Sequence, residues 1–330
     1  MAWANARFLA AAAIAGALAL GGAKPAAAED LIPVTVGRAV ATAFVFGVPD
    51  VGVEAGIWKK NGIDLKILSF NGDAQLQQAM AAGSVDFGLG SGPAMGYAVK
   101  GVPAKAVAAM AGAPDDMALV ATSNLKAKSL DDLKGAKIGC TTAGSLTYWL
   151  VKKLSAEKGW TGADALQPTP VGSERNQLAA MKTGAIQASI GTTTEGATLE
   201  VNKEGRIILP LGSVVTDFIT HVIFARDDLI KNHPDTVRKF LKGWFETVAY
   251  MKTHEEPTLK VGEKLLNAPE AVVRKTYPTD IVKMLSNDGA FDPNAVKVVA
   301  QSLVALGILK TEPAPDQMYT SEFVPVKLGK

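Results

Sequence analysis

The sequence predicts an α/β protein built from two similar lobes. Short apolar segments alternate with amphipathic ones, as in residues 34–37, 48–58 and 63–68, which is the strand, helix, strand order of a parallel sheet. Residues 78–90 also align without a gap to residues 179–191, so the chain contains an internal repeat. No low-complexity linker divides the chain, which favours two lobes joined by two crossing segments.

Each copy of the repeat predicts a helix, a glycine that ends it, a strand and a glycine-opened turn. The identical pairs are Ala79 and Ala180, Met80 and Met181, Gly83 and Gly184, and Gly90 and Gly191. We expect lobe I to comprise residues 29–118 and 220–330, and lobe II to comprise residues 119–219. Helical periodicity after Pro234 predicts a C-terminal helical block that packs back on lobe I.

The first 28 residues have the pattern of a cleavable signal peptide. Arg7 supplies a positive charge, residues 8–22 are apolar, and Ala26 and Ala28 form a small-residue cleavage motif before Glu29. A membrane anchor is the alternative, but the apolar segment is shorter than the roughly 20 residues that a spanning helix needs. We therefore expect export.

Charge and cysteine content narrow the partners and the compartment. Removal of Arg7 and Lys24 with the signal peptide reduces the 34 basic residues to 32, which equals the 32 acidic residues. A balanced charge argues against nucleic acid or an anionic membrane as the main partner. With Cys140 as its single cysteine, the chain cannot form an internal disulfide. It also has no cysteine directly after the signal peptide that could carry a lipid. A bacterial periplasm is the expected location.

The sequence offers little for catalysis. His221, His233 and His254 have no metal-ligand spacing, and residues 88–93 lack the third glycine of a dinucleotide-binding motif. Cys140 could be a nucleophile, although a buried small apolar role is favoured. We expect a binding protein rather than an enzyme, with no metal and no cofactor.

Polar turns recur where the predicted strands end. The turn at residues 141–145 is followed by a helix, so its hydroxyls and free N–H groups lie at the positive end of a helix dipole, which suits an electron-rich ligand group. Open α/β sheets bind ligands at the carboxyl ends of their strands. The predicted ligand-binding residues are Ala41, Thr42, Phe44, Asn71, Gly72, Ser91, Gly92, Thr141, Thr142, Gly144, Ser145, Arg175, Thr192 and Thr193.

Several side chains have two interpretations. Phe44 can cover a ligand or pack in the core. Arg175 can face an anion or pair with Glu174 at the surface. His221 can reach the ligand or serve a structural role, and the sequence does not assign a role to Glu195.

Four segments together resemble a known family. These are Gly-Ile-Trp-Lys-Lys-Asn-Gly-Ile-Asp-Leu at 56–65, Gln-Ala-Met-Ala-Ala-Gly-Ser-Val-Asp-Phe-Gly at 78–88, Lys-Gly-Val-Pro at 100–103 and Ser-Leu-Asp-Asp-Leu-Lys-Gly-Ala-Lys-Ile-Gly at 129–139. In order and spacing the chain resembles the nitrate, sulfonate and taurine substrate-binding proteins of ABC importers, the NMT1/THI5-like superfamily. The resemblance implies a type II periplasmic-binding-protein fold with a ligand cleft and two hinge crossings. It also implies a monomer that docks transiently on an ABC permease, and it assigns the cleft role to matching turns at 41–44, 71–72, 91–92, 141–145 and 192–193.

The chain departs from that family at two places. Gln187 replaces a usual aspartate, and the threonines at 192–194 replace an aromatic or acidic residue that often follows the strand. We expect a small organic anion of the sulfonate or carboxylate type as ligand. The alternatives are a neutral or heterocyclic nutrient such as a thiamine-precursor pyrimidine, and a periplasmic enzyme on the same scaffold.

Overall fold

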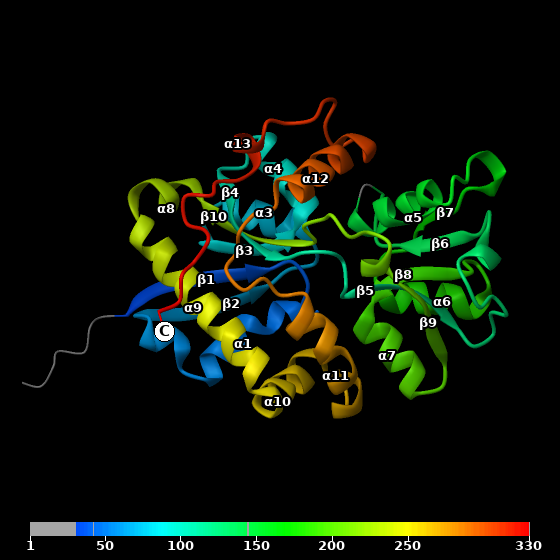
Figure 1. Ribbon diagram of the computed structural model, residues 1–330, viewed down its shortest axis with the longest axis horizontal. Coiled ribbons are helices and arrows are strands. Elements are labelled where there is room, and N and C mark those ends of the chain that lie inside the picture. The colour runs from blue at the N-terminus through cyan, green and yellow to red at the C-terminus, as the bar shows by residue number, and fades with distance from the viewer. Residues whose placement is uncertain (1–30, 42, 144, 330) are drawn as a thin grey trace, which may run out of the picture. The chain divides into compact units, whose positions relative to one another are not determined.

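The computed structural model describes residues 31–41, 43–143 and 145–329. The predicted signal peptide and the predicted site residues Thr42 and Gly144 lie outside this part. Residues 31–330 group into one compact unit, within which the strands form two five-stranded sheets (Figure 1). The first sheet contains β1 (Ile32–Arg38), β2 (Ile63–Ser69), β3 (Phe87–Ser91), β4 (Ala104–Ala111) and β10 (His221–Arg226). The second contains β5 (Met117–Thr122), β6 (Lys137–Cys140), β7 (Gln167–Pro170), β8 (Ala188–Thr192) and β9 (Gly205–Pro210).

The two sheets have the same topology. The strand order is β2-β1-β3-β10-β4 in the first and β7-β6-β8-β5-β9 in the second. In each, the fourth strand, β10 or β5, is antiparallel to its neighbours, and the first three strands are parallel. The predicted α/β fold with two similar lobes is therefore confirmed.

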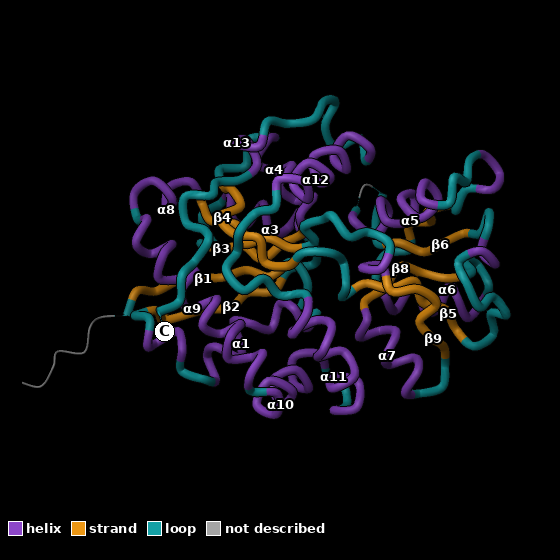
Figure 2. The backbone as a smooth tube through the Cα atoms, in the orientation of Figure 1, coloured by secondary structure: helices purple, strands orange, loops and turns teal. Residues whose placement is uncertain are grey.

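Two segments connect the lobes. Residues 112–116 lead from β4 to β5, and residues 211–220 lead from β9 to β10. Both are loops over most of their length and run between the two sheets in Figure 2. Because β10 returns to the first sheet, the strands of lobe I come from both ends of the chain. The residue limits predicted for the lobes stay a prediction.

Helices flank both sheets. In lobe I these are α1 (Val48–Glu54), α2 (Ile57–Lys60), α3 (Asp73–Ala81) and α4 (Gly96–Val99), and in lobe II they are α5 (Leu146–Glu157), α6 (Glu174–Thr183) and α7 (Thr193–Val201). The single helix expected over 48–58 is two helices, because Gly56 between them has a left-handed φ of 70° that interrupts helical geometry. The chain ends with α8 (Asp227–Asn232), α9 (Pro234–Thr253), α10 (Glu255–Leu266), α11 (Glu270–Tyr277), α12 (Pro293–Ala305) and α13 (Pro315–Met318).

The C-terminal helical block contributes aromatic side chains to the core around the first sheet. Helix α9 buries Phe240 and Trp244 one turn apart, so they share one face of the helix. Phe240 stacks on Phe87 of β3 with ring centroids 3.9 Å apart, and on Trp58 of α2 at 5.1 Å. Burial of each such ring contributes roughly 2–3 kcal/mol. This aromatic stack fixes α9 against the first sheet.

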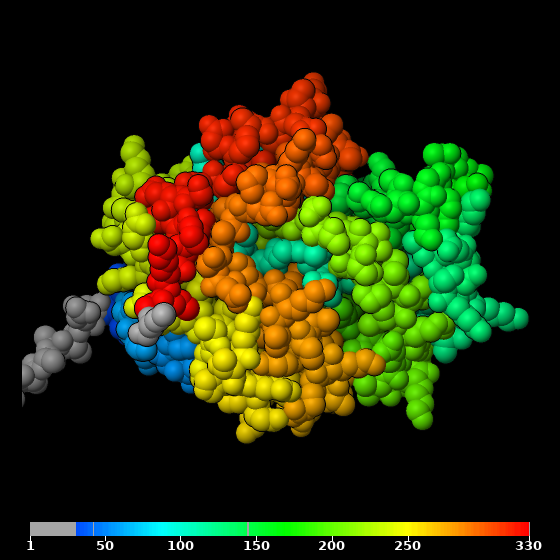
Figure 3. Space-filling model, in the orientation of Figure 1, coloured from blue at the N-terminus to red at the C-terminus, as the bar shows by residue number. Residues whose placement is uncertain are grey.

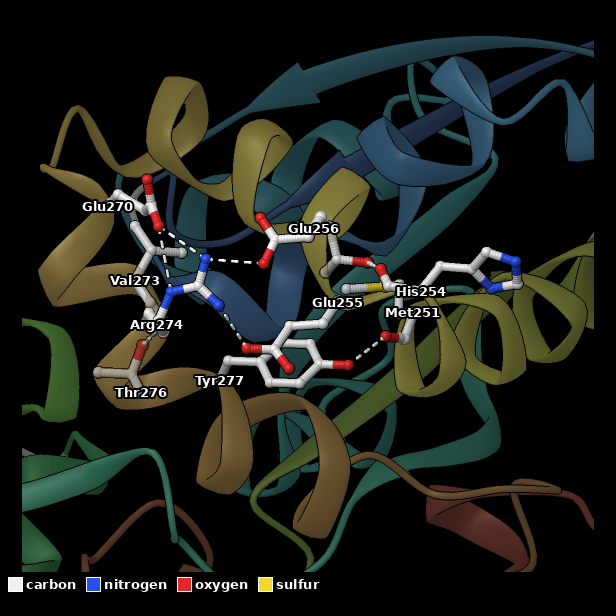
Figure 4. A network of polar contacts seen from close by, with 10 residues as sticks. Met251, His254, Glu255, Glu256, Glu270, Val273, Arg274, Thr276 and Tyr277 are labelled. Atoms are coloured by element: carbon white, nitrogen blue, oxygen red, sulfur yellow. Dashed lines mark hydrogen bonds and ion pairs between the residues drawn. The ribbon is translucent and has the colours of Figure 1, made fainter.

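The guanidinium of Arg274 in α11 contacts carboxylates at the start of α10 (Figure 4). This group contacts three carboxylates, at distances of 3.0, 2.8 and 2.6 Å for Glu255, Glu256 and Glu270. The next residue, Lys275, pairs with Glu200 of α7, so α11 also reaches lobe II. Within the described residues, no helix combines the length and the hydropathy needed to cross a membrane.

Candidate ligand-binding site

The carboxyl ends of the parallel strands in both sheets lie next to the two crossing segments. In lobe I, Ser91 at the end of β3 is paired in register with His221 at the start of β10. In lobe II, Thr192 at the end of β8 is paired with Met117 at the start of β5. The turns that carry the predicted site residues therefore flank the crossings.

The predicted residues of lobe I have different environments. Ala41 and Asn71 are exposed, and Gly72 precedes α3 with a φ of 105°, a conformation that favours glycine. Phe44 is buried and belongs to the core of lobe I, where it lies close to Gly262 of α10. The burial of the Phe44 side chain supports the core-packing interpretation over the ligand-covering one.

An acid that the sequence analysis did not select, Asp73, binds Ser91. The Ser91 N–H donates to Oδ1 of Asp73 at 3.0 Å, and the Ser91 hydroxyl donates to Oδ2 at 2.8 Å. Burial raises the pKa of Asp73, while these hydrogen bonds and the attraction of His221 lower it in part. Both carboxylate oxygens thus have a partner.

Gly92 is positioned by the hinge. Its N–H donates to the carbonyl of Thr220 at 2.8 Å, and a Cβ at this position would lie 1.9 Å from the carbonyl oxygen of Ile219. Only glycine fits such a close backbone approach. The second crossing therefore packs directly on the end of β3.

In lobe II the turn after β6 forms a compact set of hydroxyls. The Thr147 hydroxyl oxygen accepts from the Thr141 N–H at 2.9 Å and lies 2.9 Å from the Ser145 hydroxyl. Ser145 caps α5 by accepting from the Tyr148 N–H at 3.2 Å. The N–H groups of Leu146 and Thr147 have no hydrogen bond to a described residue. Thr142, another predicted site residue, is exposed.

The turns after β7 and β8 bring two glutamates together. Glu174 is the first residue of α6, and the hydroxyl and the backbone of Thr192 lower its pKa in part. Thr192 also caps α7, because its hydroxyl oxygen accepts from the Glu195 N–H at 3.1 Å. Burial raises the pKa of Glu174, and burial together with repulsion from Glu174 raises the pKa of Glu195 well above its ordinary value. Arg175, the predicted anion ligand, is exposed.

The carboxylate of Glu195 has no hydrogen-bond partner among the described residues. The residue as a whole is partly exposed, but both carboxylate oxygens are buried and accept no hydrogen bond from the described residues. A Cβ on Gly191 would lie 1.9 Å from Oε2 of Glu195, so the carboxylate fits only because residue 191 has no side chain. Neither Glu174 nor Glu195 forms an ion pair within the described chain.

The buried acid Asp280 makes a contact to lobe II through Thr193. Thr193, at the start of α7, donates to Asp280 in the π-helical turn after α11, at 2.8 Å to Oδ1 and 3.0 Å to Oδ2. Burial raises the pKa of Asp280 well above its ordinary value, and repulsion from Asp116 adds to this. Asp116 lies in the first crossing, 3.0 Å from Nε2 of His221. His221 therefore lies at the hinge, with the ring of Phe46 edge-on at 4.8 Å.

Acids rather than cations dominate these turns. The acids are Asp73, Asp115, Asp116, Glu174, Glu195 and Asp280, whereas the basic side chains in contact with them are His221 and Lys283. Asp73, Glu174 and Asp280 were not selected from the sequence because an acid in the first turn of a helix is ordinarily a solvated cap. The repeat could have pointed to two: Asp73 corresponds to Glu174, and Ser91 to Thr192.

Cys140 ends β6 and is buried, which raises the pKa of its thiol to about 11. A thiol with that pKa is protonated near neutral pH and is a poor nucleophile. Among the described residues, no group of three or more His, Cys, Asp and Glu side chains is arranged to hold a metal ion.

A pocket of about 390 Å³ lies beside the hinge, between the crossings and residues 282–295. Figure 3 shows a hollow on this face, between the orange segment around residue 285 and the yellow-green segment around residue 217. Its lining includes Phe218, Ile219 and Lys252 but none of the predicted site residues. The candidate site is therefore defined by the strand-end turns and not by this pocket.

Comparison with known structures defines the class of fold. The chain has the fold of periplasmic binding proteins: it matches the aliphatic sulphonate binding protein SsuA of Escherichia coli with a TM-score of 0.73 at 15% identity, over 90% of this chain and 94% of that one. It matches the periplasmic nitrate-binding protein NrtA of Synechocystis PCC 6803 with a TM-score of 0.70 at 14% identity, over 90% and 88% of the two chains.

Sequence comparison identifies the family. The model of the NMT1/THI5-like family matches residues 51–257, more than half of the chain, and the protein belongs to this family. A relative from Brucella abortus that is described as a binding protein is 27% identical over 95% of this chain and 98% of its own length. The family predicted from the four sequence segments is confirmed.

Proposed function

We propose that this protein is the periplasmic solute receptor of an ABC importer. It captures a small molecule between lobe I (29–118 and 220–330) and lobe II (119–219) and delivers it to a membrane permease. The observation that carries this proposal is the arrangement of equivalent strand-end turns, on two sheets of the same topology, on either side of two crossing segments. Such an arrangement closes on a ligand by hinge motion. The names of the structural neighbours, SsuA and NrtA, support the same class.

The start of α5 is the proposed seat for an anionic group of the ligand. The N–H groups of Leu146 and Thr147 have no described partner and lie at the positive end of a 12-residue helix. A sulfonate or carboxylate oxygen can accept from both. Ser145, Thr141 and Thr142 supply hydroxyls around the same turn.

A thermal-shift screen tests the receptor function. The purified chain is heated with sulfonates, carboxylates, nitrate and pyrimidines, and a true ligand at 100 times its Kd stabilises the folded state by about 2.7 kcal/mol. Ser145→Ala should weaken binding of an anionic ligand. Ser173→Ala is the matched control, because Ser173 caps α6 in the same way but is exposed. A screen in which no compound raises the melting temperature would contradict the proposal.

A heterocyclic nutrient, such as a thiamine-precursor pyrimidine, is the second candidate ligand. The raised pKa of Glu195 favours it, because a protonated carboxyl can both donate to and accept from an aminopyrimidine edge. The enzyme alternative has less support, since the Cys140 thiol is buried with a raised pKa. Product formation from a stabilising ligand, abolished by Cys140→Ala, would favour the enzyme.

The remaining parts of the proposal concern export and assembly. We infer that residues 1–28 direct export and are removed, and that the mature protein is a monomer that docks transiently on its permease. Cell fractionation followed by mass spectrometry of the N-terminus tests the first point. Native mass spectrometry with and without ligand tests the second.

A further inference from the structure

The equivalent turns of the two lobes differ by one acid. Asp73 with Ser91 in lobe I corresponds to Glu174 with Thr192 in lobe II. Ser91 hydrogen-bonds Asp73 through its N–H and its hydroxyl, and the same groups of Thr192 lower the pKa of Glu174. By the same alignment, Ala94 of lobe I is replaced by Glu195 of lobe II. Lobe II therefore carries a second carboxylate, that of Glu195, which has no counterpart in lobe I.

The position of Glu195 is fixed by contacts of its backbone and its Oε2, but its carboxylate has no hydrogen-bond donor among the described residues. The backbone N–H of Glu195 is bound by Thr192, and its Oε2 occupies the space that Gly191 leaves free. Both carboxylate oxygens are buried without a hydrogen-bond donor from the described residues, and the only charge identified as acting on them is the like charge of Glu174. A buried carboxylate in this setting needs a proton or a cation to offset its desolvation.

The location favours a cation that arrives with a ligand. Glu195 lies in the first turn of α7, at the carboxyl edge of the sheet, where open α/β sheets bind small molecules. Two residues earlier, Thr193 makes the contact to Asp280 that joins the lobes. The neighbouring Arg175 is exposed and forms no ion pair with either glutamate within the described chain.

We propose that Glu174 and Glu195 form a subsite for a protonated nitrogen of the ligand. The group would be a primary ammonium, a guanidinium or a protonated ring nitrogen, and its N–H donors would pair with the oxygens of Glu195. This inference rests on the proposed receptor function. The ligand class that follows is a small solute that carries a cationic nitrogen in addition to any anionic group bound at α5.

Matched probe pairs test the subsite. The first pair is 3-aminopropanesulfonate and 3-hydroxypropanesulfonate, the second is 4-aminobutyrate and 4-hydroxybutyrate, and 1,4-diaminobutane is a probe without an anionic group. The members of each pair differ only in an ammonium or a hydroxyl at one end. Calorimetry and thermal shift are recorded for the wild type, Glu195→Gln, Glu174→Gln and the surface control Glu204→Gln, whose carboxylate pairs with Lys182 outside the site.

We expect the wild type and Glu204→Gln to bind the amine of each pair roughly tenfold or more tightly than the alcohol, as a charge-assisted hydrogen bond predicts. In Glu195→Gln the preference should fall to within about twofold while binding of the alcohol persists. Glu174→Gln should reduce the preference by a smaller factor. Gln keeps the shape of Glu, so unfolding is not the expected result, and the melting temperature of each ligand-free variant verifies this.

Two results would overturn the inference in different ways. In the first, the amines bind no more tightly than the alcohols, or Glu195→Gln keeps the preference for the amine. The two glutamates would then share a proton and bind no cation, and the receptor function would stand. Stabilisation by none of the probes, and by none of the wider screen, would contradict the receptor function itself.

Discussion

The two lobes present the same structural unit at their facing edges, but lobe II carries one additional carboxylate, that of Glu195. In lobe I, Asp73 accepts two hydrogen bonds from Ser91 and is attracted by His221. In lobe II, the backbone and the hydroxyl of Thr192 lower the pKa of Glu174, and Glu195 has two buried oxygens with no described donor.

The hinge side of the unit differs as well. Gly92 in lobe I meets the backbone of the second crossing, whereas the equivalent Thr193 in lobe II donates to Asp280 on the C-terminal block. Both lobes nevertheless bind a crossing through the backbone, since the N–H of Gly92 donates to Thr220 and the N–H of Thr193 donates to Asp116, each at 2.8 Å. The side-chain contact from Thr193 to Asp280 is additional in lobe II. The comparison indicates that the two units share their backbone contacts and that lobe II differs by the added carboxylate of Glu195, which has no described hydrogen-bond donor.

The largest effect should come from Gly92→Ala. The new Cβ would lie 1.9 Å from the Ile219 carbonyl oxygen, which is backbone and cannot move away without shifting the crossing. We expect a loss of about 2–3 kcal/mol in the free energy of unfolding, measured by urea denaturation. Gly112→Ala in the other crossing is the control, since no atom lies within 4 Å of its added Cβ. Equal stability of the two variants would refute the close-packing account.

The next largest effect is the loss of stability on removing Asp73, which should exceed the loss on removing the equivalent Glu174. Asp73→Ala leaves the Ser91 N–H and hydroxyl without their acceptor, so we expect a loss of about 1–2 kcal/mol. Glu174→Ala removes the equivalent bonds but also ends the repulsion of Glu195, so its loss should be smaller. Urea denaturation of both variants at one pH gives the comparison. A larger loss for Glu174→Ala would show that the two acids do not differ as described.

Glu195→Gln should stabilise the ligand-free protein by about 1 kcal/mol at pH 8. Since the pKa of Glu195 is higher in the folded than in the unfolded chain, the folded state binds the proton more tightly. The stability that this proton contributes is complete below the ordinary glutamate pKa and is lost as the pH rises through the raised value. The advantage of the variant should therefore grow as the pH is raised from about 4.5, near the ordinary glutamate pKa, to pH 8. Melting curves across this range check the trend, and a constant difference would contradict it.

Thr193→Val removes the hydroxyl that binds Asp280 between the lobes. Thr279 still donates to Asp280, so the expected loss is only about 0.5–1 kcal/mol. The variant should also open more readily, which small-angle scattering would detect as a larger radius of gyration without ligand. Thr194→Val, in the same helical turn, is the control. An unchanged scattering curve and stability for Thr193→Val would argue against a role for this contact in holding the lobes.

The smallest effect is expected for Arg274→Gln. Its guanidinium contacts three exposed carboxylates, and exposed ion pairs contribute little to stability because solvent and salt screen them. We expect a decrease in melting temperature near the limit of detection at low salt and none at 1 M salt. A large decrease that persists at high salt would show that the attachment of α11 to α10 depends on this residue.

Much of the fold followed from local patterns. The repeat at 78–90 and 179–191 was visible because glycine stops and strand apolar residues recur in the same order, and the structure places β3 and β8 at its matching ends. The α9 face could be predicted from its helical spacing. The break at Gly56 could not, because an isolated glycine in an amphipathic stretch does not require a left-handed φ.

The sequence by itself determined the two α/β lobes and the family, since both depend on periodicity and spacing within short segments. The ligand-binding turns stay a prediction. Tertiary structure alone decided the charge character of the site. Whether an acid in a first helical turn is a solvated cap or a buried, unpaired carboxylate depends on what packs around it. For Asp73, Glu195 and Asp280, the groups that decide it come from other strands, from the crossings and from the other lobe.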